Sequence, residues 1–317
     1  MGRDSVARRS TVNPSTGRYF AFSDNWVPAP TLWRRDLWRT VGATPGSWAE
    51  IRAAAPALKG GGHPVGIGLS QDLDSNVALM SLMAAFGSFV QDERARVVID
   101  SPETVAAVEF GADLFRVGMT DEVLGWDAMS NNRFLQAGRG SLILNSLSVL
   151  RSIERDGPEL LPSIAVGAIP TGPSGREGLA GAVSTYGIWR FARNRDAAER
   201  FLVHLAERGR DVAVHSRFVN LPSFANVAPD LESLIGGDSV LRQAGAPAAL
   251  ATAQQWSVNL GYPGSANPAI SDVLNRSVIP DLFARVALGR AKPAAAVADT
   301  RHQIEAVYRT WRKRRLI

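Results

Sequence analysis

Hydrophobic positions in residues 45–207 fall into short apolar runs separated by longer segments of helical spacing. Residues 65–69, 97–99, 141–145, 164–169 and 182–189 are compact apolar runs, which predicts strands. Between them, apolar residues recur every three or four positions, which predicts helices over residues 101–116, 130–136 and 194–207. This alternation favours an α/β fold with a mostly parallel, layered sheet.

Capping residues indicate where the early helices begin and end. Ser47 and Glu50 form a capping box, and Pro56 predicts that the helix they open kinks or ends there. Ser75 is expected to begin a second helix, which ends at the C-cap glycine Gly87. These signals place helix starts close to strand ends, where ligand-binding loops occur.

The later part of the chain is mainly helical in its pattern. Helices are expected over residues 246–259, 269–288 and 294–314, and Pro280 predicts that the middle one is two helices. In the earlier helix over residues 194–207, Ala198, Phe201 and Leu205 follow the spacing of a stripe that faces a core.

Composition narrows the class of protein. The 317 residues are 45% hydrophobic and 21% charged, which indicates a globular chain of roughly two domains or lobes. The chain has no cysteine, which excludes disulfides, thiolate catalysis and iron–sulfur clusters. No apolar run approaches the ~20 residues that a membrane-spanning helix needs.

The net charge of +5 is carried by the two ends of the chain. Basic residues crowd residues 1–18 and 309–317, so the body lacks the basic stripe of a nucleic-acid binder and no nucleic-acid partner is expected. Residues 1–18 are expected to be a basic, flexible N-terminus. Residues 1–17 lack the apolar core of a signal peptide, so the chain as written is expected to be cytoplasmic.

The sequence contains no complete motif for binding a cofactor or a metal ion or for nucleophilic catalysis. Gly66 and Gly68 follow a strand, but Gln71 stands where a dinucleotide motif needs glycine. Residues 72–76 resemble a calcium loop that lacks its glycine at Val77 and its acid at Met83. The four histidines have no ligand spacing, and no GxSxG elbow is present. We therefore predict no cofactor, no metal and no catalytic residue, although a pair of glycosidase carboxylates distant in sequence stays open.

Several blocks resemble, in order, the extracellular solute-binding proteins of ABC transporters, specifically the sugar-binding family of maltose-binding-protein type. Residues 19–37 (YFAFSDNWVPAPTLWRRDL) resemble the family's hinge-crossing segment, and residues 41–48 (VGATPGSW) resemble a helix opening of that family. Residues 134–142 (FLQAGRGSL), 166–173 (VGAIPTGP) and 187–205 (GIWRFARNRDAAERFLVHL) match further blocks, followed by Leu221-Pro222.

The resemblance implies a periplasmic-binding-protein-like α/β fold, mainly its second lobe, with a parallel or mixed sheet flanked by helices and a helical C-terminal portion. Residues 19–189 and 220–317 would form this lobe. Residues 190–219 would be the remnant of a first lobe that is mostly missing, and a fragment of this kind is not expected to close on a ligand.

Sugar recognition requires aromatic faces and rigid polar groups on loops at strand ends, completed by hinge closure. Tyr186 and Tyr262 are the expected stacking residues, Asp74 and Ser75 suit helix caps as well as ligand contacts, and Asn145 follows an apolar strand. The candidate ligand residues are Asp24, Asn25, Asp74, Ser75, Trp126, Asp127, Asn145, Tyr186, Tyr262 and Asn267.

The resemblance implies a non-enzymatic substrate-binding component of a carbohydrate ABC importer. Its partners would be a sugar or related small polyol and the membrane permease subunits. The family's place is periplasmic, or extracellular and membrane-anchored. Two alternatives stay open at this point: a carbohydrate-active enzyme using Asp72, Asp74 and Asp127, and a truncated fragment that binds no ligand.

Overall fold

A mixed four-stranded sheet forms the centre of the computed structural model, which describes residues 6–13, 16–175, 178–179 and 181–317. The strand order is β3 (Val65–Gly66), β4 (Leu142–Leu144), β2 (Thr31–Arg34) and β5 (Ile164–Gly167). β3 and β4 are parallel, whereas β2 runs antiparallel to both β4 and β5. β3, β4 and β5 therefore run in one direction and β2 opposes them, which is the mixed sheet that the resemblance implies as one possibility. β2 follows directly from β1 (Asn25–Val27) without a helical crossover, so nothing forces it to run parallel.

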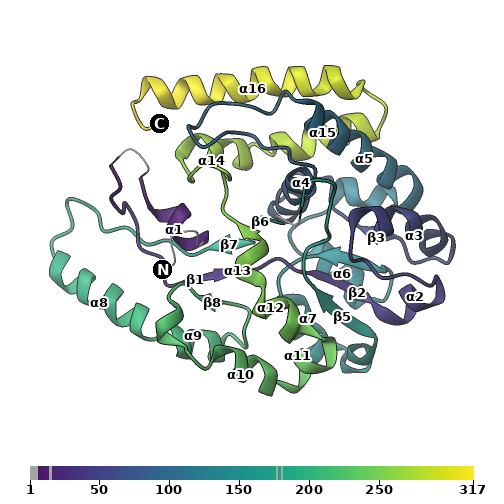
Figure 1. Cartoon of the computed structure of the whole chain (residues 1–317), viewed down its shortest axis with the longest axis horizontal. Coiled ribbons are helices and arrows are strands. Elements are labelled where there is room, and N and C mark those ends of the chain that lie inside the picture. Colours follow the sequence, from purple (N-terminus) through teal and green to yellow (C-terminus); the bar gives the residue numbers. More distant parts are fainter. Residues whose placement is uncertain (1–5, 14–15, 176–177, 180) are drawn as a thin grey trace.

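Long helices pack on this sheet and on each other. α5 (Pro102–Gly118) contacts α3 (Trp48–Gly60), α4 (Leu73–Ala85) and α15 (Val278–Ala287), and α15 also contacts α16 (Pro293–Lys313). α16 runs along one side of the molecule (Figure 1). The largest fully buried side chains include Trp38, Trp48, Phe134, Phe283 and Tyr308. Burial of such rings supplies much of the stability of this part of the chain.

A second, smaller sheet lies beside the first. β1 is its central strand and pairs antiparallel with β7 (Ala182–Val183) and β8 (Leu221–Pro222). β6 (Gly178–Leu179) and β9 (Ser257–Val258) form a separate parallel pair. The other helices are α1 (Val6–Thr11), α2 (Arg35–Thr40), α6 (Ser130–Gln136), α7 (Ser148–Asp156), α8 (Arg195–Glu207), α9 (Gly209–His215), α10 (Leu231–Gly237), α11 (Ser239–Ala244), α12 (Ala246–Ala251), α13 (Ala253–Trp256) and α14 (Pro268–Asn275), with 3-10 turns η1 (Asp121–Gly125), η2 (Pro158–Ser163) and η3 (Ala225–Val227).

Three helix predictions are corrected by the structure. α3 continues through Pro56 to Gly60, because a proline interrupts one backbone hydrogen bond while packing against α5 holds the rest of the helix. α4 begins after Asp72, whose carboxylate accepts hydrogen bonds from the backbone amides of Asp74 and Ser75. Ser75 therefore lies inside the first turn and is not the N-cap. The break between α14 and α15 falls at Arg276 and Ser277, upstream of Pro280.

Two further segments differ from the sequence-based expectations. Residues 97–99 form no strand and contribute an isolated bridge between Val97 and Gln91. Residues 6–11 of the expected flexible N-terminus form helix α1, which buries Val6 and Ala7. These apolar side chains give the segment a face that packs. Residues 1–5 and 14–15 of that N-terminus lie outside the described residues.

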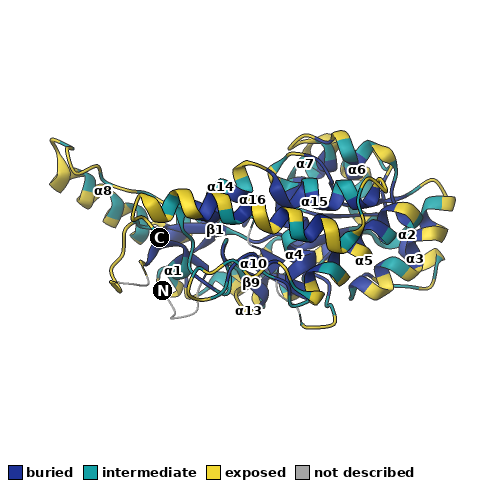
Figure 2. Cartoon of the chain, turned by 90° about the horizontal axis from the view of Figure 1, so that it is seen from above, coloured by how far each residue is buried: buried dark blue, intermediate teal, exposed yellow. Residues whose placement is uncertain are grey.

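α8 projects from the rest of the molecule (Figure 2). It forms where the spacing predicts, but it buries no residue, so the expected core-facing stripe is wrong. Phe201 and Val203 are 60% and 57% exposed. Just before the helix, Trp189 and Phe191 stack with ring centroids 5.5 Å apart while both remain largely exposed. The pattern identified an apolar face, but no described element covers it.

Across the residues that the structure describes, no helix combines the length and apolar character required to cross a bilayer.

Candidate functional site

The parallel pair β3 and β4 places two loops at the same edge of the central sheet. The segment after β3 leads through Asp72 into α4, and Asn145 follows β4 directly. In open α/β sheets, ligands bind outside the carboxyl ends of strands, because loops from neighbouring strands converge there. We call Asp72, Asp74, Asn131, Asn132 and Asn145 the cleft cluster.

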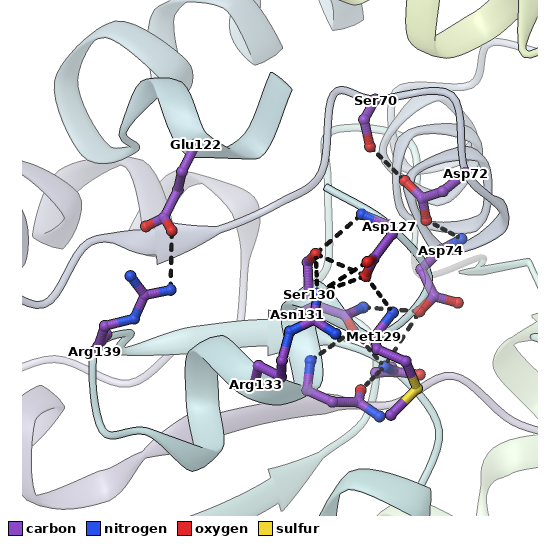
Figure 3. Close-up of polar contacts among 12 residues, drawn as sticks. Ser70, Asp72, Asp74, Glu122, Asp127, Met129, Ser130, Asn131, Arg133 and Arg139 are labelled. Carbon is purple, nitrogen blue, oxygen red and sulfur yellow. Dashed lines mark hydrogen bonds and ion pairs between the residues drawn. The ribbon is translucent and has the colours of Figure 1, made fainter. Parts of the chain in front are cut away.

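Asp72 holds the first part of the cleft cluster in place (Figure 3). Its Oδ1 accepts from the amides of Asp74 and Ser75 at 2.8 and 3.1 Å, and its Oδ2 accepts from the Ser70 hydroxyl at 2.6 Å and from the Ser75 hydroxyl. Negative charge at a helix N-terminus is also favoured by the helix dipole. Asp72 and Ser75 therefore serve mainly to fix the start of α4, and this presents Asp74.

Asp74 is joined to the amides of α6 and of the β4 loop. Its Oδ2 accepts from Asn131 Nδ2 at 2.9 Å and from Asn145 Nδ2 at 3.4 Å. Asn145 Nδ2 also donates to Asn131 Oδ1 at 3.0 Å and to Asn132 Oδ1 at 2.6 Å. The side chains of three separate segments are thus mutually oriented, which makes a rigid array of donors and acceptors.

The surroundings of Asp74 favour the neutral form of its carboxyl group. Burial raises the pKa of Asp74; the hydrogen bond from Asn131 opposes the rise, and the nearby charge of Asp72 adds to it. Asp127, at the exposed rim, behaves oppositely. Hydrogen bonds from Arg133, Ser130 and the Met129 amide lower the pKa of Asp127 to about 2, with Arg133 contributing most. Its carboxylate is 2.8 Å from Arg133 Nη2, so Asp127 is held in a surface ion pair.

Trp126 forms the floor beneath this array. Its indole is 9% exposed and packs against Phe134 with ring centroids 5.2 Å apart. A Cβ added at Gly66 would lie 2.6 Å from the Phe134 ring, and one at Gly68 would lie 2.1 Å from Ser75 Oγ, so both positions require glycine. The cavity left among these groups is about 10 Å³. This enclosed space has the size of a single water molecule or of one hydroxyl group.

A second group of predicted residues lies where the chain crosses through β1. Asp24 and Asn25 are buried, and Asn25 Nδ2 donates to Asp24 Oδ1 at 2.9 Å. The Ser184 hydroxyl donates to Asn25 Oδ1 at 3.0 Å. Tyr186 bridges to Phe22 through its backbone, and burial, followed by the charge and hydrogen bond of Asp24, raises the pKa of the Tyr186 hydroxyl. This group ties β1 to the β7 segment.

The third group, Tyr262 and Asn267, lies in the loop before α14. Asn267 caps α14 through the amides of Ala269 and Ile270, and its Nδ2 donates to Gln91 Oε1 at 2.7 Å. The ring of Tyr262 packs edge-on against Phe89, and the guanidinium of Arg9 lies 5.4 Å from its centroid. Both residues are therefore engaged in holding the loop.

The structure brings together Asp74, Ser75, Trp126, Asp127 and Asn145, and it places the other five predicted residues in the two separate groups. Sequence reasoning missed Asn131 and Asn132, which are 5% and 7% exposed at the start of α6. It also missed the fully buried Gln91, which donates to the carbonyls of Gly261 and Ser265. The signal available was an adjacent pair of amides in the first turn of a helix that follows a polar loop.

The cleft cluster has the chemistry of hydroxyl recognition. Amide and carboxylate groups at fixed positions donate to and accept from neutral hydroxyls. Among residues 6–13, 16–175, 178–179 and 181–317, no group of three or more histidines and carboxylates is arranged to hold a metal ion.

The chain has relatives of known class. The sequence profile of the bacterial extracellular solute-binding protein family matches residues 11–209. A Brucella abortus protein described as a binding protein is 22% identical over 181 residues. That match covers 56% of this chain and 44% of the Brucella protein, so the chain spans less than half of that relative.

Solved structures of this class share the fold. A Synechococcus sp. MITs9220 protein described as an oligosaccharide periplasmic-binding protein superposes with a TM-score of 0.80 at 21% identity, covering 96% of this chain and 76% of that one. Maltose-bound MalE3 of T. maritima gives 0.75 at 18% identity, covering 95% and 75%. The α/β periplasmic-binding-protein-like fold predicted from sequence is confirmed, and it is partial relative to these proteins. The profile is that of an extracellular family whose members bind solutes and are not enzymes, and this chain belongs to the bacterial extracellular solute-binding proteins.

Proposed function

We propose that this chain is the solute-capturing component of a carbohydrate ABC importer, which holds a sugar or small polyol and delivers it to the membrane permease. Family membership supports solute binding. The two structural relatives, one described as an oligosaccharide periplasmic-binding protein and one bound to maltose, support a carbohydrate as the solute.

The cleft cluster is the observation that carries the proposal. Asp74 Oδ2 is used by Asn131 and Asn145, and within the described residues Asp74 Oδ1 has no protein donor. A hydroxyl of a sugar satisfies this oxygen, and a neutral hydroxyl suits a carboxylate whose ionised form is already costly to bury. Asp74 and Asn145 are the residues that we propose contact the sugar directly.

We propose further that residues 19–189 and 220–317 form the second lobe and that residues 190–219 belong to the first. The exposed apolar face of α8 supports this division, because helices of that composition normally pack against another element. The β7–β1–β8 sheet, where the chain passes between the two parts, would then be the hinge.

One lobe presents only half of an interlobe site, so this chain should bind sugar weakly. We expect a dissociation constant near ~1 mM, equivalent to about −4 kcal/mol. The measurement is an NMR titration with maltose that follows the side-chain amide signals of Asn131, Asn132 and Asn145. Asp74→Asn should weaken binding about tenfold, since it removes an acceptor of charge-assisted hydrogen bonds while keeping its shape.

Asp156→Asn is the matched control, because Asp156 pairs with Arg155 on the exposed surface, away from the cleft cluster. It should leave the maltose affinity unchanged. Absence of any signal change from maltose or from other mono- and disaccharides, with the chain folded, would overturn the carbohydrate proposal. Micromolar binding in calorimetry would instead retain the sugar and overturn the division into lobes.

A further inference from the structure

A groove lies at the end of the central sheet opposite the cleft cluster. Because β2 runs antiparallel to β4, Trp33 pairs with Leu142 at the start of β4, whereas Asn145 follows its other end. The groove has a volume of about 570 Å³. This is within the ~300–1,000 Å³ that is usual for small-molecule sites.

Three parts of the chain line this groove. Trp33 on β2 and Ala165 and Val166 on β5 form its floor. The segment from α2 to the start of α3 forms one wall, and the junction of α11 and α12, at Gly245, forms the other. Figure 1 shows β2 and β5 between α2 and α12.

The wall formed by α2 carries the polar chemistry of the groove. Arg35 Nη2 donates to the carbonyls of Ile164 and Gln243 at 2.6 and 2.7 Å, which fixes the guanidinium between β5 and α11. Arg35 Nε is buried and has no acceptor in the described part of the chain. An atom this buried is out of reach of a ligand, so Nε itself takes no outside acceptor. Arg35 Nη1 is not enclosed in this way and has no acceptor among the described residues, so it is the donor of this side chain that is left for a group from outside the chain.

The charged side chains that line the groove are Arg35, Arg39 and Glu50, so the net charge of its lining is positive. Arg39 is exposed and forms no ion pair with any described residue, whereas the Glu50 carboxylate accepts from the Ser47 hydroxyl at 2.8 Å. The half-buried Trp33 indole lies against Gly167, where an added Cβ would be 2.9 Å from the ring. The groove therefore offers a flat apolar surface beside two guanidinium groups.

We propose that this groove binds a small organic anion with a planar ring, an aromatic carboxylate. The ring would pack on Trp33, and the carboxylate would take the free donors of Arg35 and Arg39, since guanidinium groups match carboxylates closely. This site is separate from the cleft cluster, and it stands whether or not the chain binds sugar.

Isothermal titration with benzoate, benzamide and acetate tests the proposal, because benzamide lacks the charge and acetate lacks the ring. Benzoate should bind at least tenfold more tightly than either. Arg39→Gln should weaken benzoate binding several-fold, and Arg35→Lys, which keeps the charge without the planar fork, should do the same. Arg155→Gln is the matched control, as Arg155 pairs with Asp156 on the exposed surface of α7 and should leave the affinity unchanged.

Equal affinity for benzoate and benzamide would overturn the proposal, as would unchanged benzoate affinity in both the Arg39 and the Arg35 variants. Asp74→Asn should leave benzoate binding intact, which keeps this result independent of the sugar titration. Unfolding curves of the Arg35 variant check that the contact of β5 with α11 has survived.

Discussion

α5 and α8 are helices of similar amphipathic sequence with opposite surroundings. α5 buries Ala107, Val108 and Leu114, among others, against α3, α4 and α15, whereas α8 buries none of its residues. Ser101 caps α5 by accepting from the Thr104 amide, while Asn194 makes no side-chain cap for α8. The comparison shows that periodicity determines which side of a helix is apolar, and a packing partner determines whether that side contributes stability.

Replacing one ring in each region should produce the largest contrast. Phe283 of α15 is fully buried in the core that includes α5, so Phe283→Ala should lower the free energy of unfolding by about 3–5 kcal/mol. Phe201→Ala in α8 should change it by no more than ~0.5 kcal/mol, because the ring is 60% exposed. Urea denaturation of both variants measures the difference. A comparable loss in both would mean that the α8 face is covered in solution, for example by a second copy of the chain.

The attachment of residues 209–219 to α7 and to Asp238 should show the next largest effect. Arg151 of α7 is only 10% exposed; it pairs with Asp238 at 2.9 Å and donates twice to the Arg217 carbonyl. Arg151→Ala should cost roughly 2–3 kcal/mol, because it leaves the partly buried Asp238 carboxylate with the Arg217 guanidinium, at 4.0 Å, as its only ion-pair partner among the described residues. Hydrogen exchange in α9 should accelerate with it.

Arg155→Ala is the control for that experiment, since its ion pair with Asp156 is on the surface and surface pairs contribute ~0–1 kcal/mol. Unchanged exchange in α9 of the Arg151 variant would mean that the contact of α9 with β8 alone holds the segment.

Replacing the N-cap residue of each helix by alanine compares how much N-terminal capping stabilises α5 and α8. Ser101→Ala should destabilise the chain by about 1 kcal/mol, because it removes the acceptor for the Thr104 amide. Asn194→Ala should be nearly neutral, since no cap hydrogen bond is lost. Thermal unfolding of the two variants measures both values. Equal losses would indicate that Asn194 caps α8 in solution.

The fold could be predicted from sequence where local signals and packing agree. The capping box at Ser47, the proline after Ser101 and the apolar run before Asn145 each predicted an element that the structure contains. The direction of β2 could not be predicted, because strand direction depends on which neighbours it pairs with. The exposure of α8 could not be predicted either, because the sequence of a helix does not show whether another element packs against its apolar face.

The candidate site was only partly predictable for a related reason. Asp74 and Asn145 were found because each lies close to a strand end, and parallel pairing brought those ends together. Asn131 and Asn132 were missed because their role depends on hydrogen bonds with Asn145, which lies 14 and 13 residues further along the chain. The sequence does not specify that these two segments lie side by side. Tyr262 and Asn267 have the right chemistry, but their partners Arg9 and Gln91 are distant in sequence, so only the structure shows that they hold a loop.

The substitution Asp74→Asn has the smallest expected effect on the free energy of unfolding. It tests a feature that α8 lacks, because α8 buries no carboxylate. Burial raises the pKa of Asp74, so the folded chain holds this proton more tightly than the unfolded one. The stability that this contributes is complete below the unfolded value of ~3.9 and is lost as the pH rises through the folded value. At pH 7 the ionised carboxylate therefore costs stability. Asp74→Asn removes the charge and keeps an oxygen for Asn131, so the variant should be slightly more stable than the parent at pH 7, with the advantage shrinking below pH ~4.

Asp127→Asn should show the opposite sign, because hydrogen bonds from Arg133 and Ser130 lower the pKa of Asp127 to about 2 and favour its ionised form. Urea midpoints across this pH range measure both variants, and a less stable Asp74→Asn at pH 7 would show that the buried carboxylate is net favourable in the cleft cluster.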